Sequence, residues 1–121
     1  MNKLSKHFSR SEFACKCGCG FATVDAELLK TLEVVREYFD EPVTINSGCR
    51  CGEHNRNERA ALGLPDNNSK HKQGIAADIV VKNVSPIFVY DFLFEYMPNK
   101  FGMKAYDNFT HIDVRQSKWR G

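Results

Sequence analysis

The sequence predicts one α+β domain, with helices packed on one side of a small antiparallel sheet. Two observations support this prediction. Apolar residues recur at helical spacing in two segments, and short apolar segments bounded by turn-forming residues lie between and after them. The 121 residues suit a single domain with one core, spanning residues 1–121. A content of 42% hydrophobic and 26% charged residues is ordinary for a globular protein.

In the first half of the chain, the segment from Val24 to about Phe39 predicts a helix. Its apolar residues recur every three or four positions, and Asp25 or Thr23 can cap its start. The proline that follows ends the helix, and Val43–Asn46 then predicts a strand with alternating faces. Two shorter helical segments are expected, a single turn within 9–13 and a short helix within the polar stretch 53–68.

The second half predicts a strand, a helix and a hairpin. Ile75–Val81 is an apolar run interrupted by one carboxylate, which favours a buried strand. A helix is expected to begin at Pro86, a residue suited to the first helical position, and to end near Tyr96. Two final strands, at about 101–106 and 109–115, flank the turn-forming pair Asp-Asn and therefore predict a hairpin.

Charge and hydropathy limit the possible partners. The net charge of +2 is too small to indicate nucleic-acid binding. The longest apolar run is far short of the roughly 20 residues that span a membrane. The first residues carry no apolar segment typical of a signal peptide. We expect synthesis in the cytoplasm, and release by another route if the protein acts outside the cell.

The most informative residues are His71, Asp78 and His111. Two histidines and a carboxylate are ligand types that zinc takes in catalytic sites, where a water holds the fourth position. A carboxylate inside an apolar strand is costly to bury unless it is paired or bound to metal. Taken singly, each residue has an ordinary explanation: a capped turn or an ion pair with Arg50 for Asp78, an exposed loop for His71, and a half-buried strand position for His111. If the three converge, they indicate a zinc hydrolase.

The period of two along the predicted strands indicates which side chains share a face. In the last strand, His111 and Asp113 point to one side, and Ile112 points to the other. In the strand Ile75–Val81, Asp78 likewise points away from Ala77. The apolar faces suit a core, and the polar faces suit a groove.

The five cysteines form two tight groups, and three interpretations of them are open. They can bind a structural zinc ion, form disulfides after release from the cell, or stay reduced and partly buried. The C-x-C spacing is tighter than the C-x₂₋₄-C usual in structural zinc sites. A catalytic cysteine is less favoured, because the histidines serve better as ligands. The cysteines are Cys15, Cys17, Cys19, Cys49 and Cys51.

These motifs together resemble a known family. Ser69-x-His71-x-x-Gly74-x-Ala76-x-Asp78, followed by His111-x-Asp113-x-Arg115, is similar to the zinc D-alanyl-D-alanine carboxypeptidases. Those enzymes and related peptidoglycan peptidases share a fold with Hedgehog signalling domains. The upstream segment 44–55 resembles the family's Ser-Gly-Tyr-Arg and His-Asn motifs, with Cys49 in place of the tyrosine. The resemblance spans about Phe8 to Arg115 and is closest to small members that phages or prophages often carry.

The resemblance implies a fold of the Hedgehog and DD-peptidase type and a role for each matching residue. Zinc would be bound by His71, Asp78 and His111. Arg50 would grip the carboxylate of the substrate, which the planar guanidinium can bind through both oxygens. His54 would line the cleft or hold the loop that carries Arg50. The implied partner is a peptidoglycan peptide, and we expect a monomer.

The implied reaction is metal-assisted hydrolysis of an amide, which needs a base. Zinc lowers the pKa of its bound water to about 7 and polarises the carbonyl, while the base accepts a proton. Several family members place a carboxylate three residues before the last histidine, where this chain has Asn108, whose amide is too weak a base. Asp107 is one residue away, and Asp113 is the preferred candidate, either as base or as a residue that orients His111. Tyr106 is a candidate for stabilising the oxyanion.

The sequence therefore predicts a zinc peptidase that cuts a bond in the peptidoglycan stem peptide, as a carboxypeptidase or an endopeptidase. Two alternatives are kept. The first is a catalytically silent, metal-stabilised module that binds a cell wall or forms part of a virion, which Asn108 supports. The second is a cysteine-based metal module that binds protein partners.

Overall fold

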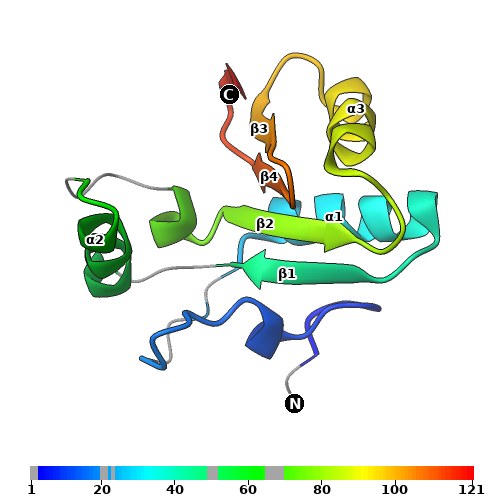
Figure 1. The fold of residues 1–121 in the computed structure, drawn as a ribbon. Coiled ribbons are helices and arrows are strands. Elements are labelled where there is room, and N and C mark those ends of the chain that lie inside the picture. Colours follow the sequence, from blue (N-terminus) through cyan, green and yellow to red (C-terminus); the bar gives the residue numbers. More distant parts are fainter. Residues whose placement is uncertain (1–2, 20–21, 23, 49–51, 65–69) are drawn as a thin grey trace.

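The computed structural model describes residues 3–19, 22, 24–48, 52–64 and 70–121, with the side chains of 53, 54 and 72 left aside. This part of the chain forms three α-helices, two 3-10 turns and five strands (Figure 1). The helices are α1 (Ala26–Phe39), α2 (Gly52–Ala61) and α3 (Pro86–Tyr96), and the turns are η1 (Arg10–Glu12) and η2 (Lys70–Gln73). The strands are β1 (Val43–Ser47), β2 (Ala76–Val81), β3 (Phe101–Ala105), β4 (Thr110–Asp113) and β5 (Lys118–Arg120).

The five strands form one open sheet in the order β1-β2-β4-β3-β5. All neighbouring pairs are antiparallel except β3 and β5, which run parallel. β4 lies between β2 and β3, so that Asp78 on β2 faces His111 on β4 in the register, and Ala76 faces Asp113. The predicted α+β class, with a small and mainly antiparallel sheet, is confirmed.

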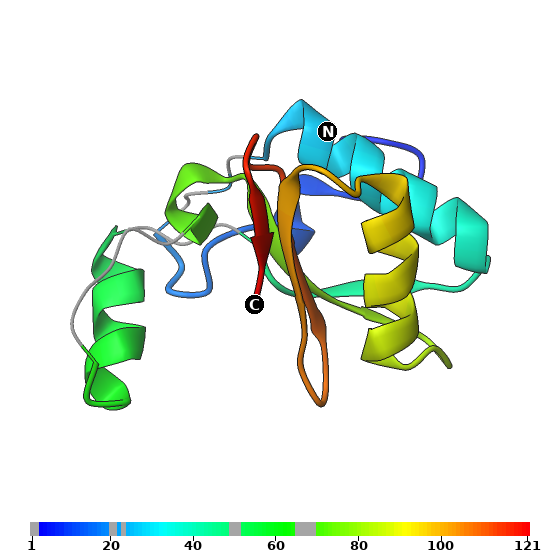
Figure 2. The same ribbon diagram turned by 90° about the horizontal axis from the view of Figure 1, so that it is seen from above.

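One face of the sheet forms the core with α1 and α3. Figure 2 shows these two helices beside each other, with α2 at the far end of the molecule. Strand residues of the inward face are fully buried, among them Ala77, Ile79 and Ile112, as their period of two predicted. The opposite face of β2 and β4 carries the polar side chains of the candidate site. The main residues that the helices contribute to the core are Leu28, Leu32, Val35, Val89 and Leu93.

The ends of α1 follow from short-range chemistry. The Asp25 carboxylate caps the helix by accepting hydrogen bonds from the backbone N–H groups of Glu27, at 2.8 Å, and Leu28. Such a cap satisfies donors that the first turn leaves without a partner. Asp40 ends the helix in the left-handed conformation, with φ of 53°. The prediction of Asp25 as cap is confirmed, and the other candidate, Thr23, lies outside the described residues.

The N-terminal segment is fastened to α1 through Glu33. The Glu33 carboxylate accepts hydrogen bonds from the Ser5 hydroxyl and from the backbone N–H of His7, at 2.8 Å, and it contacts the His7 ring nitrogen Nδ1 at 2.6 Å. Phe8 and Phe13, from the same segment, are buried in the core. The segment is therefore an integral layer of the fold.

The second half of the chain agrees with its predicted elements, with two additions. α3 begins at Pro86 after the N-cap Ser85, and the hairpin of β3 and β4 is closed by a hydrogen bond from Tyr106 N–H to the Phe109 carbonyl at 2.8 Å. The sequence did not predict η2, which carries His71, or β5, which pairs with β3. Both elements are too short for their apolar residues to show a helical or strand period in the sequence.

Candidate metal centre

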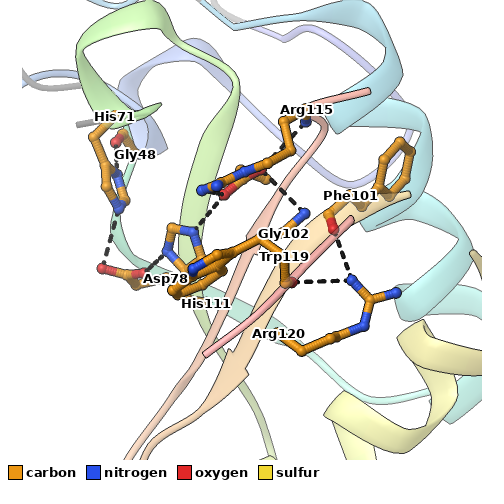
Figure 3. Close-up of polar contacts among 10 residues, drawn as sticks. Gly48, His71, Asp78, Phe101, Gly102, His111, Arg115, Trp119 and Arg120 are labelled. Atoms are coloured by element: carbon orange, nitrogen blue, oxygen red, sulfur yellow. Dashed lines mark hydrogen bonds and ion pairs between the residues drawn. The ribbon is translucent and has the colours of Figure 1, made fainter. Parts of the chain in front are cut away.

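Three predicted ligands, His71, Asp78 and His111, lie together on the polar face of the sheet (Figure 3). They come from η2, β2 and β4, and their ligand atoms all lie within 4.8 Å of one another. The register of the sheet accounts for two of them, because Asp78 and His111 are opposite residues on adjacent strands. The 3-10 turn η2 brings His71 to the same place immediately before β2.

His71 is buried, with 3% of its surface exposed, and both ring nitrogens have a defined neighbour. Nδ1 lies 2.5 Å from the Gly48 carbonyl oxygen, and Nε2 lies 3.4 Å from Oδ2 of Asp78. A carbonyl only accepts, so Nδ1 carries the proton that is donated to Gly48. The Nε2 lone pair is then directed toward Asp78.

His111 is held in the same manner from the other side. Its Nε2 lies 2.9 Å from Oδ2 of Asp113, and its Nδ1 lies 2.9 Å from Oδ1 of Asp78. With Nε2–H donated to Asp113, the Nδ1 lone pair faces a carboxylate oxygen, and two acceptors at this distance need a cation between them, either a proton or a metal ion. Metal-binding histidines almost always donate their second N–H to a carboxylate or carbonyl in this manner.

The pKa shifts of the pair agree with this picture. Burial alone would raise the pKa of Asp78, but its contacts with His111 and His71 outweigh burial and hold the pKa well below the usual range. Burial would lower the pKa of His111, but Asp113 and Asp78 outweigh it and raise the pKa above the usual value. Asp78 is thus ionised at neutral pH, and the raised pKa of His111 favours its protonated form when no metal is bound.

Asp113 is fully buried, and both of its carboxylate oxygens have several donors. Oδ1 accepts from Gly102 N–H at 3.1 Å and from Arg115 Nε at 2.7 Å, and Oδ2 accepts from Arg115 Nη2 at 2.7 Å and from His111. Burial would raise the pKa of Asp113, but His111 and Arg115 outweigh it and hold the pKa far below the usual range. This geometry favours the orienting role over the role of base.

Four residues contribute to the site without having been predicted as site residues: Gly48, Gly102, Arg115 and Trp119. A Cβ atom on Gly102 would lie 2.7 Å from both Oδ1 of Asp113 and Nε of Arg115, so only glycine fits there without a shift. The Trp119 ring stands edge-on to His111, with centroids 5.9 Å apart, and the Arg115 guanidinium lies 4.9 Å from the Trp119 ring centroid. The period of two along the last strand, continued by two residues from Asp113, indicates the same face for Arg115. The other three depend on long-range packing.

Tyr106 directly follows β3, and it is 41% exposed and stacks on Phe109 with ring centroids 4.5 Å apart. Burial and then the charge of Asp78 raise its pKa, so the phenol keeps its proton at neutral pH. Asp107 and Asn108, the positions considered for the base, are both exposed in the hairpin turn. Arg50 and the His54 side chain lie outside what the structure describes.

The first cysteine group also comes together. The Sγ atoms of Cys15, Cys17 and Cys19 lie within 4.8 Å of one another, and those of Cys15 and Cys17 are 3.4 Å apart. Cys49 and Cys51 lie outside the described residues. Among the residues that are described, no helix has the length and hydropathy needed to span a membrane.

Comparison with known proteins gives one match. A family model described as Peptidase M15 matches residues 6–113, which is most of the chain and includes all three candidate ligands. Neither the curated proteins nor the solved structures give a match. The matched region ends at Asp113, before β5 and Trp119.

Proposed function

The chain belongs to the peptidase M15 family of metallopeptidases, and we propose that it is a zinc peptidase that hydrolyses a bond in peptidoglycan stem peptides. One observation carries this proposal. Each histidine of the site donates one N–H to a buried acceptor, Gly48 or Asp113, and turns its other nitrogen to Asp78. This is the arrangement in which histidines bind a metal ion.

The donor set suits zinc. Two imidazole nitrogens and one carboxylate oxygen are a three-ligand set of catalytic zinc sites, with the fourth position left to water or substrate. Bound there, zinc lowers the pKa of that water and polarises the scissile carbonyl. His71, Asp78 and His111 would hold the ion, and the buried acceptors fix the tautomers of both rings.

Other residues would act on the substrate and on the ligands. Asp113 positions His111, because its carboxylate holds Nε2–H and is itself held by Arg115. The protonated Tyr106 hydroxyl is a donor for the negative charge that develops on the carbonyl oxygen. Arg50 would bind the carboxylate of the substrate, as the family motif implies. We place the action of the protein at the cell wall after release from the cell.

A silent metal-binding module remains the second candidate, because of one specific observation. The carboxylate on the ligand face, Asp113, is fully used by its donors, and the position of the usual base is Asn108 in an exposed turn. A protein with this site and without a base would bind zinc and peptidoglycan but would not cut it.

Metal analysis combined with cleavage of purified stem peptides distinguishes the two candidates. We expect the wild type to bind zinc and to release D-alanine or a shortened peptide. His71→Ala should lose the zinc of this site and all activity, whereas Asp91→Asn, an exposed change on α3, is the control and should keep both. Zinc binding without turnover of any stem peptide would favour the silent module. Full retention of zinc by His71→Ala would contradict the site itself.

A further inference from the structure

The cluster of Cys15, Cys17 and Cys19 has no part in the proposed reaction. It lies outside the site formed by His71, Asp78 and His111, which we call the His-Asp site. Its three sulfur atoms lie within 4.8 Å of one another. Thiolates around one zinc ion stand about 3.8 Å apart, given tetrahedral geometry and Zn–S distances of about 2.3 Å. The separation of 3.4 Å between Cys15 and Cys17 is close to that value.

The backbone explains how so tight a spacing brings three sulfur atoms together. The Gly18 N–H donates to the Cys15 carbonyl at 3.2 Å, and Gly18 adopts a left-handed conformation with φ of 80°. The chain therefore turns back between Cys15 and Cys19. In an extended chain, residues two apart point to the same side but lie about 6.6 Å apart, which is too far for sulfur atoms that share one zinc ion. The turn shortens this separation. Cys15 anchors the cluster because it is 4% exposed, and the other two are exposed.

The cysteine turn is connected to the His-Asp site through Phe13 and Gly48. A Cβ atom on Gly48 would lie 2.6 Å from the Phe13 Cα and 2.7 Å from the Phe13 carbonyl oxygen, so the two backbones are in direct contact. The Gly48 carbonyl in turn accepts the hydrogen bond from His71. A metal ion on the cysteines would stiffen the segment against which Gly48 rests.

We propose that Cys15, Cys17 and Cys19 form a second, structural zinc site that holds the N-terminal segment against Gly48. Three thiolates carry enough negative charge to neutralise Zn²⁺, and a fourth donor, water or a side chain, completes the tetrahedron. Zinc binds with loss of the three thiol protons and without any redox change. The site does not depend on the proposed peptidase activity.

Zinc content tests the proposal in full-length protein purified under reducing conditions. The double variant His71→Ala/His111→Ala, which lacks the ligands of the His-Asp site, should keep one zinc ion per chain. Adding Cys17→Ser to that double variant should remove it, whereas adding Lys16→Ser, an exposed change in the same turn, should not. A zinc-free double variant, or equal zinc in the Cys17→Ser and Lys16→Ser proteins, would overturn the proposal.

Cobalt provides a readout that does not rely on a cysteine variant folding well. In the His71→Ala/His111→Ala protein, bound Co²⁺ should show the charge-transfer absorption of thiolate ligands and a tetrahedral visible spectrum. Absence of these bands would contradict the site. So would intact mass spectrometry of unreduced protein, freshly purified from the cytoplasm of the expression host, that showed a disulfide within the Cys15–Cys19 segment.

Discussion

At the scale of single residues, the site depends on an outer layer of contacts as much as on its ligands. Asp113 accepts hydrogen bonds from Gly102, Arg115 and His111. Its side chain is fully buried, whereas a base that acts on water must be accessible to that water. The Trp119 ring lies against both Arg115 and His111. The position of His111 is therefore set in part by residues that are not among the candidate ligands.

The first prediction concerns Asp113→Asn. The amide cannot hold the Arg115 guanidinium as an ion pair, and it weakens the acceptor for His111 Nε2–H. We expect zinc affinity of the His-Asp site to fall about 10- to 100-fold. The zinc-free protein should also lose roughly 3 kcal/mol of stability, because Arg115 is left without its buried partner. Chelator competition measures the first effect, and urea unfolding measures the second.

Asp107→Asn is the matched control for that change, since it alters an exposed carboxylate four residues before His111. It should leave zinc affinity and stability unchanged. If Asp113→Asn abolished turnover while zinc affinity and stability stayed at wild-type values, Asp113 would be the base after all.

The second prediction concerns Gly102→Ala. Its new methyl group would lie within 3 Å of the Asp113 carboxylate and of Arg115 Nε, so the ion pair must shift. We expect a loss of about 1–3 kcal/mol in the free energy of unfolding, which is typical of overpacking, together with weaker zinc binding. Gly52→Ala is the control, because a Cβ there meets open space. Equal stability of the two variants would show that the Asp113 environment tolerates the methyl group.

These residues also show what a sequence can and cannot predict about a site. His71, Asp78 and His111 could be identified because their motif is local and their residue types are rare in such segments. Gly48 and Trp119 could not, because a carbonyl that accepts from His71 and a ring that covers His111 arise only when distant segments pack.

At the scale of elements, the N-terminal segment and α1 behave as one unit joined by Glu33. Burial alone would raise the pKa of Glu33, but hydrogen bonds from Ser5 and His7 outweigh it and lower the pKa below its usual value. A carboxylate with a lowered pKa stabilises the fold above its pKa in the unfolded chain, about 4.3. That contribution is lost as the pH falls through the lower pKa of the folded protein.

The third prediction follows for Glu33→Gln. The variant should lose about 1–3 kcal/mol at neutral pH, the usual cost when buried hydrogen bonds to a charged group are broken. Its stability should fall less steeply than that of the wild type below about pH 4. Urea unfolding at a series of pH values measures both effects, with Glu37→Gln, an exposed change on the same helix, as control. Parallel pH profiles for Glu33→Gln and the wild type would contradict this account.

The elements predicted well are those whose period is long enough to observe. α1, α3 and β2 appear within a residue or two of their predicted bounds, because burial on one side imposes a pattern over many residues. β5 has three residues, and it is fixed by tertiary contacts. The Arg120 guanidinium donates to the carbonyls of Phe101 and Met97, and Lys118 lies over the ring of Phe94. Such an element leaves no periodic signal.

At the scale of the whole molecule, the sheet separates two tasks. One face packs on α1 and α3 and supplies the core, and the other holds the His-Asp site across β2 and β4. The sequence predicted this division and the fold class. It did not predict that β4 lies between β2 and β3, because strand order depends on which edges the crossover through α3 leaves open.

The last prediction joins the metal to global stability. The candidate ligands come from η2, β2 and β4. We therefore expect zinc to bind the folded chain and to stabilise it, by about 2.7 kcal/mol at a free concentration 100 times Kd. The metal-free protein carries a proton on His111 over a wider pH range, since the pKa of that histidine is raised. Protons therefore compete with zinc as the pH falls.

In a Cys17→Ser background, which isolates the His-Asp site, the rise in Tm on adding zinc should be large at pH 8 and should shrink toward about pH 5. Differential scanning calorimetry with and without zinc measures this, with Cys17→Ser/His71→Ala as control. A zinc-induced rise in Tm that did not change with pH, or that was as large in the control, would contradict binding through His111 and His71.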